Sequence, residues 1–186
     1  VYAANLVHDG QLNVWGGMLY SNAALDPRER TRAEIVTRDH AFRMANYLKR
    51  TVPGFENARL EQTSTEVGIR ATRIVEGLAQ PSKAAVQAGR FADTVARPYK
   101  GRKLALPYGS IVPKGIDGLL VAGRCISADA EIMGRLRLIP VCSATGEAAG
   151  VAAALCLDNH VPPRGLDPTL LQQTLTDQGV DLGEAE

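Results

Sequence analysis

The feature that most constrains the fold is a segment built almost entirely from alanine and glycine. Residues 143–155 read Ser-Ala-Thr-Gly-Glu-Ala-Ala-Gly-Val-Ala-Ala-Ala-Leu. Alanine has the highest helix propensity, so this segment predicts an α-helix. Gly146 and Gly150 lie four residues apart and therefore share one face of that helix. A helix surfaced with such small residues lets its backbone approach a neighbour closely, either a sheet or a ligand at its N-terminus.

An apolar segment of strand length precedes this helix. Residues 118–123, Gly-Leu-Leu-Val-Ala-Gly, form an uninterrupted apolar run, which is typical of a strand covered on both faces. A strand, a loop and then a helix N-terminus can hold an anionic or carbonyl oxygen, because the first helical turn has free N–H groups and the positive end of the helix dipole. We expect the turn at 144–146, which has little side-chain bulk, to present those groups.

Neighbouring residues add to this candidate site. Ile139 and Pro140 lead into the helix and would supply a flat apolar wall. Arg124, Arg135 and Arg137 are close in sequence and could donate further hydrogen bonds. The alternative is tight packing of the helix on a sheet without any ligand, and the pattern alone leaves both open.

Local signals predict the remaining elements. A long helix is expected from Asp26-Pro27 to about Arg50, because Asp is a good N-cap and Pro is tolerated in the first turn. The other expected elements are two strands within 1–20 joined by a tight turn at 8–11, strands within 58–75, a short helix after Pro81-Ser82, a basic connector at 97–106, and a last helix from Asp167-Pro168 to about Gln178.

This succession predicts a mixed α/β chain that divides near residue 104. The 45% hydrophobic and 22% charged residues are those of an ordinary globular protein. The net charge of +1 gives no reason to propose a nucleic-acid or anionic-membrane partner. The apolar stretches are too short or too broken by small residues to predict a membrane span.

Cysteine and histidine usage argues against a metal centre. The three cysteines, Cys125, Cys142 and Cys156, lack zinc-site spacing, and the three histidines are scattered. Reduced, buried thiols in the cytoplasm are therefore expected. The chain opens on an apolar run beginning with Val1, without a secretory signal, so we expect it to be part of a longer polypeptide.

Two longer motifs resemble a known family. Residues 106–127 read LPYGSIVPKGIDGLLVAGRCIS and residues 137–150 read RLIPVCSATGEAAG. They resemble the C-terminal end of FAD-dependent oxidoreductases of the glutathione-reductase-type fold, most closely a bacterial group with the patterns PYxSLVPKGxxNLLVAGRCIS and RxxPxCxATGxAAG. Upstream, 53–55 and 67–73 resemble the PGFEN and GxRETR segments of that group. The resemblance keeps its order over most of the chain.

The resemblance implies which residues meet the cofactor. In such proteins the end of the Ala-Gly strand passes beside the pyrophosphate and ribityl chain of FAD, and the Ala-Thr-Gly helix start faces the pyrimidine carbonyl of the flavin. The implied roles are Gly123 and Arg124 at the pyrophosphate–ribityl region, Ile139 and Pro140 along the ring, and backbone N–H donation from Ala144, Thr145 and Gly146 to the ring oxygen.

Two departures from the family pattern matter. The G-x-G-x-x-G loop of its N-terminal βαβ unit has no counterpart here, and neither Gly16-Gly17 nor 115–118 replaces it. Ala71 stands where GxRETR has Glu, which puts a substrate role of that segment in doubt. The candidate substrate residues are Arg70, Arg73 and Arg137.

These features together predict the function. We expect a partial FAD/NAD(P)-binding-type fold, with 1–104 part of a substrate-binding lobe and 105–186 the C-terminal part of the FAD-binding domain. The implied activity is hydride transfer between a small organic substrate and FAD, with the catalytic base and the substrate unidentified. The FAD-binding segment that is missing would come from elsewhere in the polypeptide or from a partner chain, and self-association could cover the apolar surface.

Two other classes of function stay open at this point. The first is a non-catalytic subunit or expressed domain of the same fold that binds no flavin alone. The second is a phosphate- or nucleotide-binding module without redox chemistry.

Overall fold

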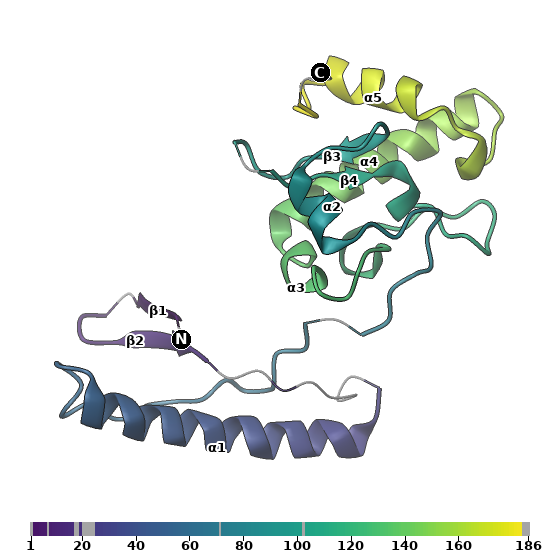
Figure 1. The fold of residues 1–186 in the computed structure, drawn as a ribbon. Helices are drawn as coiled ribbons and strands as arrows, with labels where there is room; N and C mark the ends of the chain where they lie inside the picture. The colour runs from purple at the N-terminus through teal and green to yellow at the C-terminus, as the bar shows by residue number, and fades with distance from the viewer. Residues whose placement is uncertain are drawn as a thin grey trace. The chain divides into compact units, whose positions relative to one another are not determined.

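The computed structural model describes residues 2–6, 8–16, 19, 25–70, 72–101 and 103–183 (Figure 1). The chain forms two compact units, Val1–Thr72 and Arg73–Glu186. The units therefore divide at residues 72 and 73 and not near residue 104 as expected. The reason is that β3 (Thr94–Ala96) pairs with β4 (Leu106–Pro107) across the expected boundary, so the chain on both sides of residue 104 belongs to one unit.

The first unit begins with the predicted hairpin. Strands β1 (Tyr2–Asn5) and β2 (Leu12–Trp15) are antiparallel, with Asn5 opposite Leu12. Two backbone hydrogen bonds close the turn, Leu6 N to Gln11 O at 3.0 Å and Gln11 N to His8 O at 3.2 Å. The alternation of turn and apolar residues was therefore enough to identify this element.

Helix α1 (Pro27–Thr51) is also confirmed, including its start. The Asp26 side chain accepts a hydrogen bond from the backbone N–H of Arg28 at 2.8 Å, which satisfies one of the free donors of the first turn. Val52 caps the other end. Ala33 is the one buried hydrophobic residue among the described part of this unit, so α1 has little core to pack against.

The strands predicted within 58–75 are wrong for the described residues of that range, which have no strand. Side chains of α1 bind this segment instead. The N–H of Val67 donates to Glu34 Oε1 at 2.6 Å, and Arg38 donates to Thr63 Oγ1 at 2.6 Å and to Thr65 O at 3.1 Å. Some backbone N–H and C=O groups of this segment, which would pair with a neighbouring strand in a sheet, therefore bond to side chains of α1.

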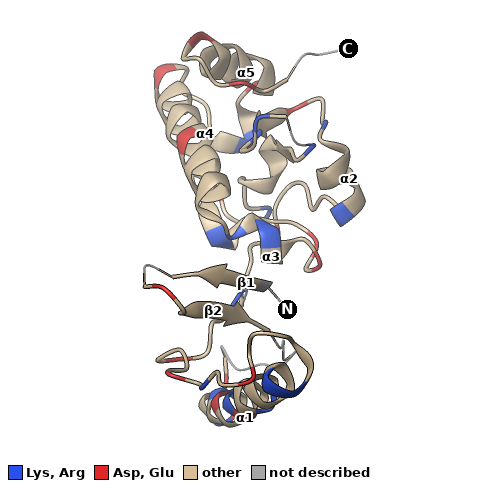
Figure 2. Cartoon of the chain, turned by 90° about the vertical axis from the view of Figure 1, so that its left-hand side faces the viewer, with Lys and Arg blue, Asp and Glu red and all other residues tan. Residues whose placement is uncertain are grey.

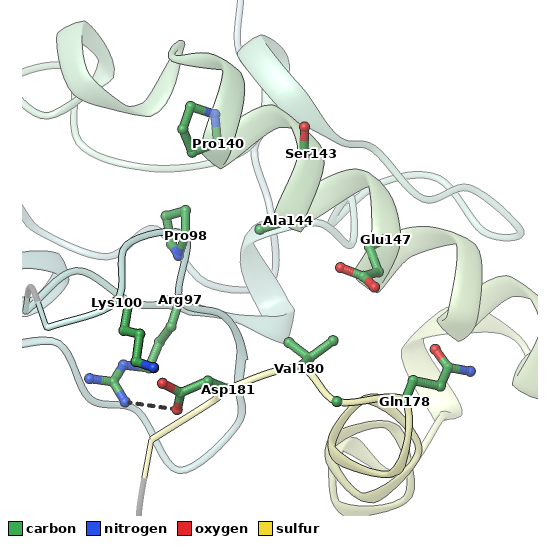
Figure 3. A pocket seen from close by; sticks show the side chains of 11 residues that line it. Arg97, Pro98, Lys100, Pro140, Ser143, Ala144, Glu147, Gln178, Val180 and Asp181 are labelled. Atoms are coloured by element: carbon green, nitrogen blue, oxygen red, sulfur yellow. Dashed lines mark ion pairs between the residues drawn. The ribbon is translucent and has the colours of Figure 1, made fainter.

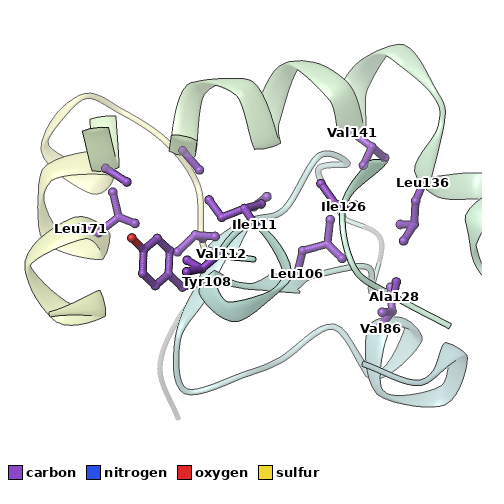
Figure 4. Packing of buried hydrophobic residues seen from close by; sticks show 14 of the residues in the cluster. Val86, Leu106, Tyr108, Ile111, Val112, Ile126, Ala128, Leu136, Val141 and Leu171 are labelled. Atoms are coloured by element: carbon purple, nitrogen blue, oxygen red, sulfur yellow. The ribbon is translucent and has the colours of Figure 1, made fainter. Parts of the chain in front are cut away.

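The second unit holds a well-packed core (Figure 4). Helix α2 (Lys83–Ala88) follows Pro81-Ser82 as predicted, and it packs Val86 into this core. Leu106, Ile111 and Ile126 are fully buried at its centre. Burial raises the pKa of the Tyr108 hydroxyl, and the nearby Cys156 adds to that shift. This hydroxyl donates to the carbonyl of Pro163 at 2.8 Å.

Residues 118–123 do not form the predicted strand. Leu119 is exposed, and the segment is attached by single hydrogen bonds such as Val121 N to Ile111 O at 2.9 Å. A neighbouring isolated bridge joins Gly77 to Pro113, and Val75 N donates to Cys125 O at 2.9 Å. The segment is therefore held in place without a regular ladder and is not covered on both faces.

Three helices complete the second unit: α3 (Met133–Leu136), α4 (Ile139–Asp158) and α5 (Pro168–Asp177). Helix α5 begins as predicted, with the Asp167 side chain accepting from Thr169 N at 2.9 Å. By length and composition, α4 is the one described helix that could cross a membrane. That is weak evidence, because a core helix passes the same test, and one face of α4 packs in the core through Val141, Ala148 and Ala152.

Candidate functional site

The site begins at a 3₁₀ turn formed by Gly123–Cys125, which we call the glycine turn. Gly123 has a φ of +74°, a left-handed conformation that favours glycine. Its N–H donates to Thr145 Oγ1 at 3.0 Å. A Cβ added at Gly123 would lie 3.6 Å from Cys142 Sγ, so the turn rests directly on α4.

Thr145 connects the glycine turn to the helix. Its side chain is fully buried. The hydroxyl accepts a hydrogen bond from Gly123 and donates one to the carbonyl oxygen of Val141 at 2.8 Å. The sequence pattern predicted a backbone donor at this position. The structure instead shows a side chain that fixes the loop, a contact that no local pattern indicates.

Helix α4 starts earlier than predicted. Its first residue is Ile139, with Pro140 in the first turn, so 144–146 lie inside the helix and not at its N-terminus. Interior N–H groups are bonded to the carbonyls four residues before them. At the actual start Pro140 has no N–H, and the N–H groups of Val141 and Cys142 both donate to Leu138 O at 3.0 Å. The free donors expected from Ala144, Thr145 and Gly146 are therefore not available in this geometry.

One face of α4 is bare and uncharged. Ile139 is 82% exposed and Leu157 is 75% exposed. Between them lie Gly146 and Gly150, and a Cβ added at either would meet no other atom within 4 Å. Figure 2 shows α4 almost without charge, in contrast to α1, which carries both signs. A flat apolar group could lie directly against this part of the backbone.

The arginines predicted for the site belong to both units. Arg124 lies in the glycine turn and is exposed. Arg137 lies two residues before the start of α4 and is half-buried; its Nε is buried without a hydrogen-bond partner among the described residues. Arg70 belongs to the first unit and Arg73 to the second, and both are exposed. Ala71, between them, lies outside the described residues.

The cysteines are free thiols in three different environments. Cys125 is exposed, Cys142 is half-buried and Cys156 is buried. The expectation of buried thiols is thus wrong for Cys125, because it lies in the glycine turn at the surface. Burial raises the pKa of the Cys156 thiol, which favours the unreactive protonated form. In the part of the chain that the structure describes, no group of His, Cys, Asp and Glu residues could hold a metal ion.

Sequence reasoning missed a second feature of the site. A hollow of about 560 Å³ lies beside the first turns of α4 (Figure 3). It is lined by the loop at 97–100, by Pro140 and Ala144 on α4, and by the segment 178–181. The basic loop was noted in the sequence only as a connector, and no pattern indicated that 178–181 would lie against α4.

The second unit thus combines a glycine turn, an Ala/Gly helix with a bare face, and a hollow at the start of that helix. Comparison with known families shows the class of protein to which the chain belongs. The model of the FAD dependent oxidoreductase family matches residues 4–100 and 97–175. The chain therefore belongs to the FAD dependent oxidoreductase family, and its cofactor is FAD. Neither the curated proteins nor the solved structures that were compared give a match.

The residues present fit part of an FAD. The open space over Gly146 and Gly150 and the exposed Ile139 suit one face of a flat ring system. Gly123 has no side chain and a positive φ that favours glycine, so the glycine turn presents bare backbone at this position. The sequence contains no G-x-G-x-x-G loop, so the usual donors to a dinucleotide pyrophosphate are not among these residues.

Proposed function

We propose that the chain is the C-terminal part of an FAD-dependent oxidoreductase and supplies one wall of its flavin site. The observation that carries this proposal is the hydrogen bond from Gly123 N–H to Thr145 Oγ1, which joins the glycine turn to α4. This hydrogen bond holds together the two segments that carry the family's motifs. A flavin site built from both motifs requires them to be close. The family membership supports an oxidoreductase.

In the proposed reaction, a hydride passes between a small organic substrate and FAD. When bound, FAD supplies the redox chemistry, and the protein orients it and excludes water. Ile139 and Pro140 would form an apolar wall along the ring, and the bare backbone at Gly146 would allow close contact. The positive end of the α4 dipole lies at this wall and would stabilise negative charge that develops there.

The dinucleotide-binding loop would come from another segment of the polypeptide or from a partner chain. The lack of a G-x-G-x-x-G loop and the bare face of α4 support this part of the proposal. The three free cysteines support a reducing compartment such as the cytoplasm. The same bare face also favours the second candidate, a subunit of the same fold that binds no flavin by itself.

Absorbance in the flavin bands tests these alternatives. The purified chain should carry no stoichiometric FAD, whereas the protein assembled with its loop-bearing segment should be yellow and lose its colour on anaerobic reduction by substrate or dithionite. An assembled protein that is folded but colourless would leave the non-catalytic subunit as the explanation. Stoichiometric FAD on the chain alone would show that no further segment is needed.

A further inference from the structure

The hollow beside α4 has basic and acidic residues separated along its length. Figure 3 shows Arg97, Lys100 and Asp181 together on one side and Glu147 with Gln178 on the other. The first group contains two cations and one carboxylate, so that side carries a net positive charge. Counted with Glu147, the lining holds two cations and two carboxylates, so the charges are separated along the hollow without a net charge.

Arg97 has hydrogen-bonding capacity that its neighbours do not use. Its Nη1 lies 3.7 Å from Asp181 Oδ1, which is an ion pair but too long for a hydrogen bond. Its Nε is buried and has no hydrogen-bond partner among the described residues. The side chain as a whole is 23% exposed, so a ligand in the hollow would meet its accessible part and not this buried Nε. The planar guanidinium is suited to a carboxylate, which it binds through two parallel hydrogen bonds.

Apolar side chains form the rest of the lining. Pro98 and Pro140 lie at the upper part of the hollow in Figure 3, and Ala144 and Val180 lie between the basic and acidic sides. A ligand with a charged end and a compact apolar body would therefore find a partner for each part. Pro140 belongs to the wall proposed for the flavin, and Ala144 lies one turn further along α4.

We propose that this hollow binds a small organic carboxylate, with the carboxylate on Arg97 and Lys100 and the apolar body against Pro98, Ala144 and Val180. That this carboxylate is the oxidoreductase's substrate rests on the function proposed above, because only then does a redox centre lie beside it. The binding of the anion itself does not depend on FAD.

The test is calorimetric titration of the purified chain with benzoate and with its neutral counterpart benzamide. Benzoate should bind and benzamide should not. Arg97→Gln should weaken benzoate binding by about tenfold or more, because it removes the hydrogen bonds from the charged guanidinium to the carboxylate. Lys100→Gln, at an exposed side chain that is not expected to affect folding, should weaken it by a smaller factor. Asp181→Asn should tighten binding, because it removes the carboxylate that competes for Arg97.

Lys83→Gln is the matched control, because it removes one positive charge outside the hollow, where Lys83 pairs with Glu131 at 3.3 Å. It should leave benzoate affinity unchanged. Equal binding of benzoate and benzamide, or weaker binding in Asp181→Asn, would overturn the proposal. Tighter binding of phenyl phosphate than of benzoate, with the same dependence on Arg97, would assign the hollow to a phosphate and also overturn it. Benzoate binding in a protein that takes up no FAD when assembled would instead reject only the proposed oxidoreductase function.

Discussion

At the scale of single residues, Thr145 holds the candidate site together. Thr145→Val keeps the shape of the side chain but leaves the Gly123 N–H without its acceptor. We expect a loss of about 1–3 kcal/mol in the free energy of unfolding, measured by urea denaturation. Thr176→Val is the control, because its exposed hydroxyl donates within its own helix, to Gln172 O on α5 at 2.8 Å, and it should cost less than about 0.5 kcal/mol. Equal costs would mean that the glycine turn does not depend on Thr145.

Tyr108 makes stability depend on pH at the alkaline end. Burial raises the pKa of its hydroxyl, so the folded protein keeps a proton that the unfolded chain loses above its ordinary pKa of about 10. The stabilisation is therefore complete below about pH 10 and is lost as the pH rises further. Tyr108→Phe should be less stable than the wild type at neutral pH by about 1–3 kcal/mol, because the Pro163 carbonyl loses its donor. The difference in stability between the wild type and this variant should narrow above about pH 10. A difference in stability that stays constant above about pH 10 would contradict the raised pKa of the Tyr108 hydroxyl.

At the scale of elements, the bare face of α4 gives a prediction that separates flavin contact from helix packing. Gly146→Val and Gly150→Val add the same side chain into open space, so both variants should keep the melting temperature of the wild type. Gly146 lies one turn nearer the proposed flavin wall. In the assembled flavoprotein, Gly146→Val should therefore weaken FAD binding by about 1–3 kcal/mol, and Gly150→Val by clearly less.

Fluorescence titration with FAD would provide that comparison. Equal losses of FAD affinity in the two variants would indicate that this face packs against another segment, with no specific contact between Gly146 and the flavin ring. Unchanged FAD affinity in both variants would show that this face of α4 is not part of the flavin site.

Helix ends were the part of the fold that the sequence predicted well. Asp26 and Asp167 act as N-caps as expected, because a cap is a contact between residues close in sequence. The start of α4 was missed because Ile139-Pro140 was interpreted as a loop, although Pro is well tolerated in a first helical turn. That error of one turn changed which N–H groups are free at the site.

Strands were predicted less well, for a different reason. A strand needs a partner, and the partner is chosen by packing far away in sequence. Residues 118–123 have a strand-like composition, but only isolated hydrogen bonds such as that of Val121 hold them. The hollow was missed for the same reason, because Arg97 and Val180 are brought together only by the fold. The family motifs, in contrast, did indicate the glycine turn and α4.

At the scale of the whole molecule, the two units differ greatly in packing. In the described part of the first unit only Ala33 is a buried hydrophobic residue, whereas the second unit contains a continuous core. We therefore expect α1 to open more readily than α4. Hydrogen exchange should show amides of α1 protected by at least about 1.4 kcal/mol less than the buried amides of α4, a tenfold difference in opening. Matching protection in both helices would mean that the units unfold together.

The central claim is that the glycine turn and the first turns of α4 form the part of the chain that meets FAD. Titration of the isotopically labelled chain with FAD, followed residue by residue in amide NMR spectra, tests it most directly. We predict weak binding, with the largest shifts at Gly123, Arg124, Ile139 and Gly146 and little change in the hairpin β1–β2. Shifts concentrated in the first unit, or saturable binding that leaves the glycine turn unchanged, would contradict the claim.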